Sequence, residues 1–202
     1  MKLSSVIARV CQLLLVVLAI GFAVGVSAQT PSPTPPATAT PSPAAIPPAN
    51  PADVATMDSI IAAVYDVISG PAKSPRNWDR FRSLFVPGAR LIPTGKMPTG
   101  EVMARVRTPE EYIQRSAPLL EQNGFFEREI SKRVERYANI AHIFSTYESR
   151  HAKDEEKPFA RGINSFQLVN DGERWWVLSI LWDSERRGNT IPGKYLKTVR
   201  EK

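Results

Sequence analysis

Three polar residues in apolar surroundings are the first candidates for chemistry. His142 lies in an apolar run with Phe144, so its ring could face a cavity as a base or hydrogen-bond donor, or it could be a core histidine satisfied by a neighbour. Asp183 follows Trp182 at the end of an apolar run, where it could be a carboxylate at the mouth of a cavity or an ordinary turn residue at the end of a strand. Asn164 also lies in an apolar run, so it either joins a buried network or contacts a ligand. His142 and Asp183 are the candidate catalytic residues.

Aromatic side chains could surround these groups as the walls of a pocket. Tyrosines would supply phenolic donors, and tryptophan and phenylalanine rings would supply apolar walls, although plain core packing is the alternative for each ring. The predicted ligand pocket comprises Tyr65, Trp78, Phe81, Phe85, Tyr112, His142, Asn164 and Trp182.

Several classes of site are disfavoured by the residues present. The two histidines, His142 and His151, lack metal-ligand spacing, and Cys11 is the only cysteine, so we predict no metal site. No phosphate-binding glycine loop, serine-nucleophile motif or dinucleotide fingerprint is present, and we predict no cofactor. The net charge is only +6, and the charges alternate in sign within residues 125–137, which indicates a solvated strand face and no nucleic-acid partner.

The N-terminus has the pattern of a targeting segment. Residues 1–28 combine Lys2 and Arg9, an apolar run at 13–26 and small residues before Gln29, which predicts a secretory signal peptide cleaved after Ala28. Export to the periplasm or outside the cell follows, and an uncleaved membrane anchor is the alternative. Residues 29–51 hold nine of the eighteen prolines and no charge, so they are predicted to be a disordered linker.

The remaining elements must position the candidate residues. Apolar spacing predicts helices at 52–70, 77–85 and 108–123, with Thr108 and Glu111 forming a capping box at the third. Strands are predicted at 89–92, 102–106, 125–137 and 138–150, followed by a hairpin over 161–183 that turns at Asn170-Asp171-Gly172. This domain is predicted to span 52–184, and a basic irregular tail to cover 185–202.

This order of elements resembles the nuclear transport factor 2-like superfamily. The segment from Trp78 to Ala89 is similar to its second helix and short strand, and Ala141–Tyr147 to a middle strand. Arg161–Phe166, with Asp171-Gly172 and Trp175, is similar to its final hairpin. The resemblance implies an α+β cone in which three N-terminal helices pack on a strongly curved mixed or antiparallel sheet around a central pocket.

Three functions remain open from the sequence. The first is an exported domain that binds a small apolar ligand. The second is a lyase, isomerase or hydrolase that moves protons on an apolar carbonyl-bearing or polyketide-like substrate, as the resemblance to enzymes of the superfamily implies. The third is a non-catalytic module that forms a homodimer through the outer face of the sheet. A membrane would be contacted only through an uncleaved N-terminal segment.

Overall fold

This computed structural model of the chain describes residues 45–197. The predicted signal peptide, most of the predicted linker and the last five residues of the tail lie outside that range, so export stays a prediction. Within residues 45–197, no helix is long and apolar enough to cross a membrane.

The helices begin and end close to where the sequence predicts, with one break. The predicted helix at 52–70 is two helices, α1 (Pro51–Val54) and α2 (Met57–Ile68), because Thr56 and Ser59 form a capping box that starts α2 anew. Next come α3 (Trp78–Arg82) and α4 (Pro109–Asn123). The capping box predicted for α4 is present, with Thr108 and Glu111 each bonding the other's backbone N–H.

Six strands form one sheet in the order β2-β1-β6-β5-β4-β3. They are β1 (Phe85–Lys96), β2 (Val102–Ala104), β3 (Phe126–Tyr137), β4 (Ile140–Arg150), β5 (Ala160–Asn170) and β6 (Trp175–Ser184). Only the pair of β1 and β6 is parallel, so the sheet is mixed. The predicted short strand at 89–92 was wrong in length, because pairing with β6 and β2 extends it at both ends. The predicted α+β fold class is confirmed.

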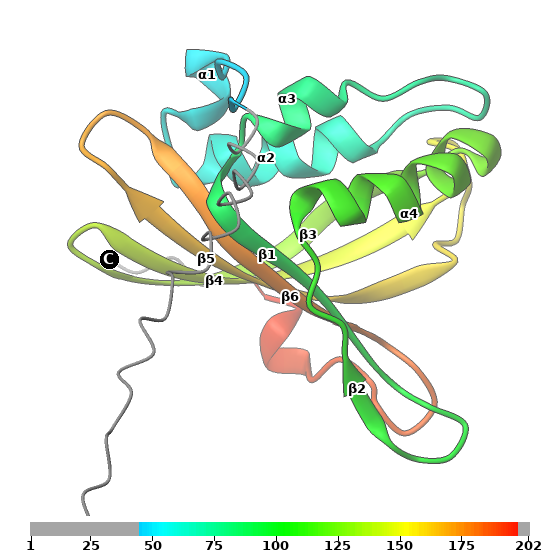
Figure 1. The fold of residues 1–202 in the computed structure, drawn as a ribbon. Helices are drawn as coiled ribbons and strands as arrows, with labels where there is room; N and C mark the ends of the chain where they lie inside the picture. The colour runs from blue at the N-terminus through cyan, green and yellow to red at the C-terminus, as the bar shows by residue number, and fades with distance from the viewer. Residues whose placement is uncertain (1–44, 198–202) are drawn as a thin grey trace, which may run out of the picture. The chain divides into compact units, whose positions relative to one another are not determined.

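The helices α1 to α4 cover one face of the sheet, and the segment before residue 198, drawn in red, lies on the other (Figure 1). The predicted irregular tail contains a short 3-10 helix, η1 (Gly193–Tyr195), that packs on the outer face. Thr146 Oγ1 donates a hydrogen bond to the Tyr195 carbonyl at 2.6 Å, and the Tyr195 ring centroid lies 5.3 Å from that of Phe144. The tail therefore covers part of the face through which a homodimer was predicted, and the dimer stays a prediction.

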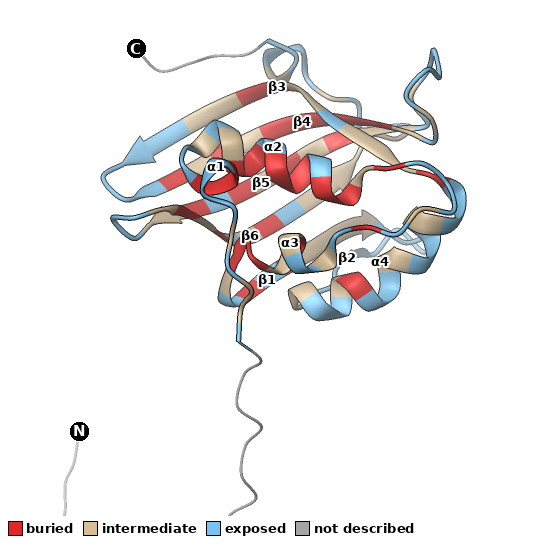
Figure 2. Ribbon diagram, turned by 90° about the horizontal axis from the view of Figure 1, so that it is seen from above, coloured by how far each residue is buried: buried red, intermediate tan, exposed pale blue. Residues whose placement is uncertain are grey.

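The core lies between α2 and the inner face of the sheet, where buried residues gather on both elements (Figure 2). Ile60, Ile61 and Val64 of α2 are almost fully buried, as are Phe166 of β5 and Val177 of β6. Burying a large apolar side chain contributes about 1.5–3 kcal/mol, so this layer fixes the position of α2 over the strands. Its position in turn decides which strand residues face the interior.

Candidate functional site

An interior cavity of about 230 Å³ lies between α2, α4 and the inner face of the sheet. Aromatic rings form one wall. Tyr112 stacks on Phe81 with ring centroids 5.4 Å apart, and its edge contacts Trp182 at 6.3 Å. The full lining comprises Val64, Ile68, Phe81, Leu91, Tyr112, Ser116, Leu120, Phe125, Glu127, Tyr147, Asn164, Phe166, Ile180 and Trp182. The cavity is mostly apolar with a few polar groups, which is the usual character of a small-molecule site.

Glu127 brings the only carboxylate to the lining of this cavity. Its Oε2 accepts a hydrogen bond from Ser149 Oγ at 2.8 Å, and its Oε1 accepts a long one from Asn164 Nδ2 at 3.4 Å. Within residues 45–197 no ion pair joins Glu127 to a cation. Burial therefore raises the pKa of Glu127 to about 7, because two neutral donors only partly replace the lost water.

Two phenols also reach the cavity, and both stay protonated at neutral pH. Burial raises the pKa of Tyr147 to about 12, and its hydroxyl lies 3.1 Å from Ser184 Oγ. Burial also raises the pKa of Tyr112 well above its ordinary value, and the nearby charge of Glu127 raises it further. Tyr112 and Tyr147 are thus hydrogen-bond donors on the lining around one carboxyl group.

A chain of hydrogen bonds leads from Asn164 towards the surface. Ser145 Oγ donates to Glu129 Oε2 at 2.5 Å, so its oxygen must accept the bond that joins it to the Tyr65 hydroxyl at 2.7 Å. The Tyr65 oxygen in turn accepts from Asn164 Nδ2 at 3.1 Å. At the outer end, Lys132 Nζ lies 2.9 Å from Glu129 Oε1. Every donor in the chain points towards Glu129, which fixes the orientation of the Asn164 amide.

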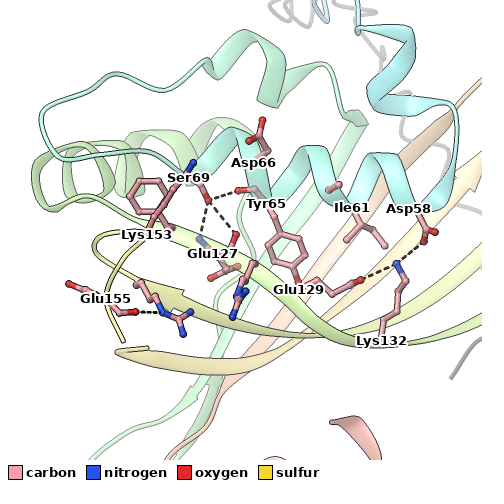
Figure 3. Close-up of a pocket in the computed structure, with 14 residues that line it drawn as sticks. Asp58, Ile61, Tyr65, Asp66, Ser69, Glu127, Glu129, Lys132, Lys153 and Glu155 are labelled. Atoms are coloured by element: carbon pink, nitrogen blue, oxygen red, sulfur yellow. Dashed lines mark hydrogen bonds and ion pairs between the residues drawn. The ribbon is translucent and has the colours of Figure 1, made fainter. Parts of the chain in front are cut away.

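A groove of about 800 Å³ runs between α2 and β3 on the outside of this chain of bonds (Figure 3). Glu127 lines both the groove and the interior cavity, so the cavity lies directly behind this side chain. Ser69, the C-cap of α2, holds β3 here, because its Oγ accepts from the Glu127 N–H at 3.0 Å and donates to the Tyr65 carbonyl at 2.7 Å.

Neither candidate catalytic residue faces the cavity. His142 lies on the outer face, where Nε2 is 2.9 Å from Ser165 Oγ and Nδ1 is 3.6 Å from Glu135. Asp183 lies at the edge of a separate outer hollow and accepts bonds from both terminal nitrogens of Arg186. Both residues therefore have partners that fit the structural role, which was the alternative that the sequence left open for each.

The predicted pocket residues divide into two groups. Phe81, Tyr112, Asn164 and Trp182 line the cavity. Of the others, Tyr65 contacts the cavity through Asn164, whereas His142 does not approach it. Trp78 and Phe85 pack behind the aromatic wall: Trp78 Nε1 donates to Glu121 at 3.0 Å, and Phe85 is buried 4.7 Å from Phe81 between ring centroids. The aromatic prediction thus identified one wall but not the polar centre.

Glu127 was not among the predicted site residues, because the charge pattern of residues 125–137 predicted a solvated strand face. A bulge at Ile130 shifts the register of β3 against β4, so Glu127 and Glu129 before it and Lys132 after it all face α2. One signal was available: Ser145 and Ser149 continue the inward face of β4 and require polar partners. Within the described range, no group of three or more histidine, aspartate or glutamate side chains could hold a metal ion.

No protein-family model and no curated protein matches this sequence. The fold is similar to solved structures of low identity. A protein of unknown function with a cystatin-like fold from Nostoc punctiforme is 10% identical, with 64% of this chain and 88% of that chain covered and a TM-score of 0.48. An NTF-2 like protein of unknown function from Silicibacter pomeroyi is 12% identical, with 65% and 94% covered and a TM-score of 0.45. A protein from Kribbella flavida is 13% identical, with 65% and 90% covered and a TM-score of 0.49. The α+β arrangement that the sequence resemblance implied, with helices packed on one mixed sheet, is present in this chain.

Proposed function

We propose that the domain binds a small, largely apolar molecule in the interior cavity, with the ligand's polar group bonded to Glu127. The observation that carries this proposal is a mostly apolar cavity whose lining includes a single carboxyl group and two protonated phenols. A ligand with one hydroxyl or carbonyl group would satisfy these polar side chains while its rings contact the apolar walls.

The cavity volume limits the size of the ligand. Because a cavity of about 150 Å³ can hold benzene, about 230 Å³ suits a ligand of about ten non-hydrogen atoms. Monocyclic phenols, cyclic ketones and lactones have this size and polarity. For so few atoms we expect a dissociation constant on the order of 0.1 mM.

Ligand-observed NMR against a panel of these three classes tests the binding proposal. Ser116→Leu should weaken the binding of any hit by about tenfold, because the added atoms fill a site that lines the cavity. Gln122→Leu also places a leucine on α4, but at an exposed position away from the cavity lining, and should leave binding unchanged. A panel without hits, or equal affinities in the two variants, would reject the cavity as the binding site.

A second candidate function is proton transfer on the bound molecule, with Glu127 as the base. The pKa of about 7 favours it, because a carboxyl group that is half ionised near neutral pH can both accept and return a proton. Tyr112 or Tyr147 would donate a hydrogen bond to the carbonyl oxygen of the substrate, where negative charge develops as the adjacent carbon loses its proton.

Deuterium exchange at the carbon beside a cyclic ketone, followed by NMR in heavy water, tests this second function. We expect Glu127→Gln to slow the protein-catalysed exchange by about 10²- to 10⁴-fold while the ketone still binds. The wild-type rate should rise with pH around a midpoint near 7, as the carboxylate forms. If the ketone binds and its exchange rate is the same with wild type and variant, the domain binds ligands without proton transfer.

A further inference from the structure

A second hollow of about 480 Å³ lies on the surface near the start of α4, and it shares no lining residue with the interior cavity. Its lining consists of Arg105, Val106, Arg107, Glu111 and Arg115. We propose that this arginine hollow is a binding site for a phosphate group, carried either by a soluble molecule or by the headgroup of an anionic phospholipid. The proposal does not depend on the function of the interior cavity.

The backbone holds two of the arginines in fixed positions. The Arg107 N–H donates to the Leu91 carbonyl at 3.0 Å, and the Leu91 N–H donates back at 2.8 Å. The Arg105 N–H donates to the Pro93 carbonyl at 3.0 Å. Arg105 and Arg107 both line the hollow from the short segment between β2 and α4. Their positions are set before any ligand arrives.

The third arginine comes from the helix. Arg115 follows Glu111 by one turn, and residues four apart lie on one helix face, which here is the face that lines the hollow. Arg90 does not line the hollow, although its charge, like that of Arg115, lowers the pKa of Glu111. Two separate elements thus bring arginines to one concave surface.

The single acid in the hollow is already engaged. Glu111 Oε2 accepts from the Thr108 N–H at 2.7 Å and from the Thr108 hydroxyl at 3.1 Å, and these bonds hold its pKa below the ordinary value. By contrast, no salt bridge in the described part of the chain involves Arg105, Arg107 or Arg115. Three arginines therefore line the hollow with one carboxylate, which gives it a net charge of +2.

The chemistry of these groups fits phosphate better than a generic anion. Planar guanidinium groups bind phosphate through paired hydrogen bonds, and several arginines can share its oxygens. Val106 lines the hollow and is 62% exposed, and two more exposed apolar side chains are near in sequence: Leu119, one turn after Arg115 in α4, is 61% exposed, and Val102, three residues before Arg105, is 73% exposed. A phospholipid headgroup would place its acyl chains near these residues, whereas a soluble phosphate would leave them in water.

Binding to the full chain tests the proposal with two probes. Inorganic phosphate is titrated and followed by NMR of the arginine side-chain N–H groups. Vesicles of phosphatidylglycerol or of phosphatidylcholine are tested by co-sedimentation. The double variant Arg105→Gln/Arg115→Gln should bind the effective probe about tenfold more weakly or worse. The control, Lys157→Gln/Arg187→Gln, removes the same charge at exposed positions elsewhere and should retain binding. Thermal unfolding confirms that both variants fold.

The outcomes separate the two sources of phosphate. Saturable binding of inorganic phosphate that the arginine variant loses and the control keeps would support a soluble ligand. Binding to phosphatidylglycerol but not phosphatidylcholine vesicles, lost in the arginine variant and in Val102→Asp, would support a lipid headgroup. The proposal is overturned if neither probe binds, or if the control loses as much binding as the arginine variant, since net charge alone would then explain the effect.

Discussion

Replacing Glu127 with glutamine should change how stability depends on pH. Burial raises the pKa of this carboxyl from 4.5 to about 7 in the folded protein. Between these values the folded chain binds more protons than the unfolded chain, so stability falls as pH rises. Each pKa unit corresponds to about 1.36 kcal/mol, and the full loss by about pH 8 is therefore about 3 kcal/mol. Below about pH 4 both states are protonated and the loss is absent.

Urea unfolding of wild type and Glu127→Gln at a series of pH values measures this loss. Glutamine has the shape of the protonated acid and cannot ionise, so the two proteins should be about equally stable near pH 4. The variant should become the more stable one by about 3 kcal/mol near pH 8. Other titrating groups are common to both proteins and cancel in the difference. Glu173→Gln, at an exposed loop position, should show no such trend.

A difference in stability that does not vary with pH would refute the reasoning. It would mean that Glu127 is ionised and solvated in the folded protein near neutral pH. In that case the carboxylate would face the groove rather than the cavity, and both the ligand contact and the proton-transfer proposal would lose their central residue.

Three further changes should affect stability in defined ways, and urea unfolding measures each. Tyr65→Phe should lower the free energy of unfolding by about 1–3 kcal/mol, because Ser145 and Asn164 lose their hydrogen bonds to the buried hydroxyl. The control Tyr137→Phe, at a position 80% exposed, should leave the free energy of unfolding almost unchanged. Gly162→Ala should lower the free energy of unfolding by about 1–3 kcal/mol, because the added Cβ would lie 2.5 Å from the Asp183 carbonyl oxygen. In the control Gly95→Ala the added Cβ meets no atom within 4 Å, so an equal loss of stability there would contradict this explanation. Arg76→Ala should lower the free energy of unfolding by about 3 kcal/mol or more. The reason is that the buried guanidinium donates to the carbonyls of Ile68, Gly70 and Leu120, near the ends of α2 and α4. A loss below about 1 kcal/mol would show that water replaces the guanidinium.

The position of His142 shows that an alternating pattern does not tell which face of a strand meets the helices. Alternation in β4 separates His142 and Phe144 from Ala141 and Ile143, but both sets are apolar enough to be covered. The structure places Ala141 and Ile143 against the helices, whereas His142 and Phe144 face outwards beside the tail. When both faces of a strand are covered, its sequence does not indicate which face packs against the helices, because that depends on where α2 packs.

The sequence by itself determined the class of fold and the elements that build it. Helix caps, apolar spacing and turn residues are local signals, so they predict α2, α4 and the hairpin of β5 and β6 without reference to the rest of the chain. The aromatic side chains were also recognisable as a wall, since a large ring is buried in almost any packed arrangement.

Only the tertiary structure decided the polar centre of the site. The position of Glu127 depends on a bulge in β3, on the facing hydroxyls of β4 and on the amide of Asn164 in β5. The charge pattern of residues 125–137 is the same whether this side chain is wet or buried. Burial and its effect on the pKa arise from atoms distant in sequence, so they exist only once α2 and the three strands have packed together.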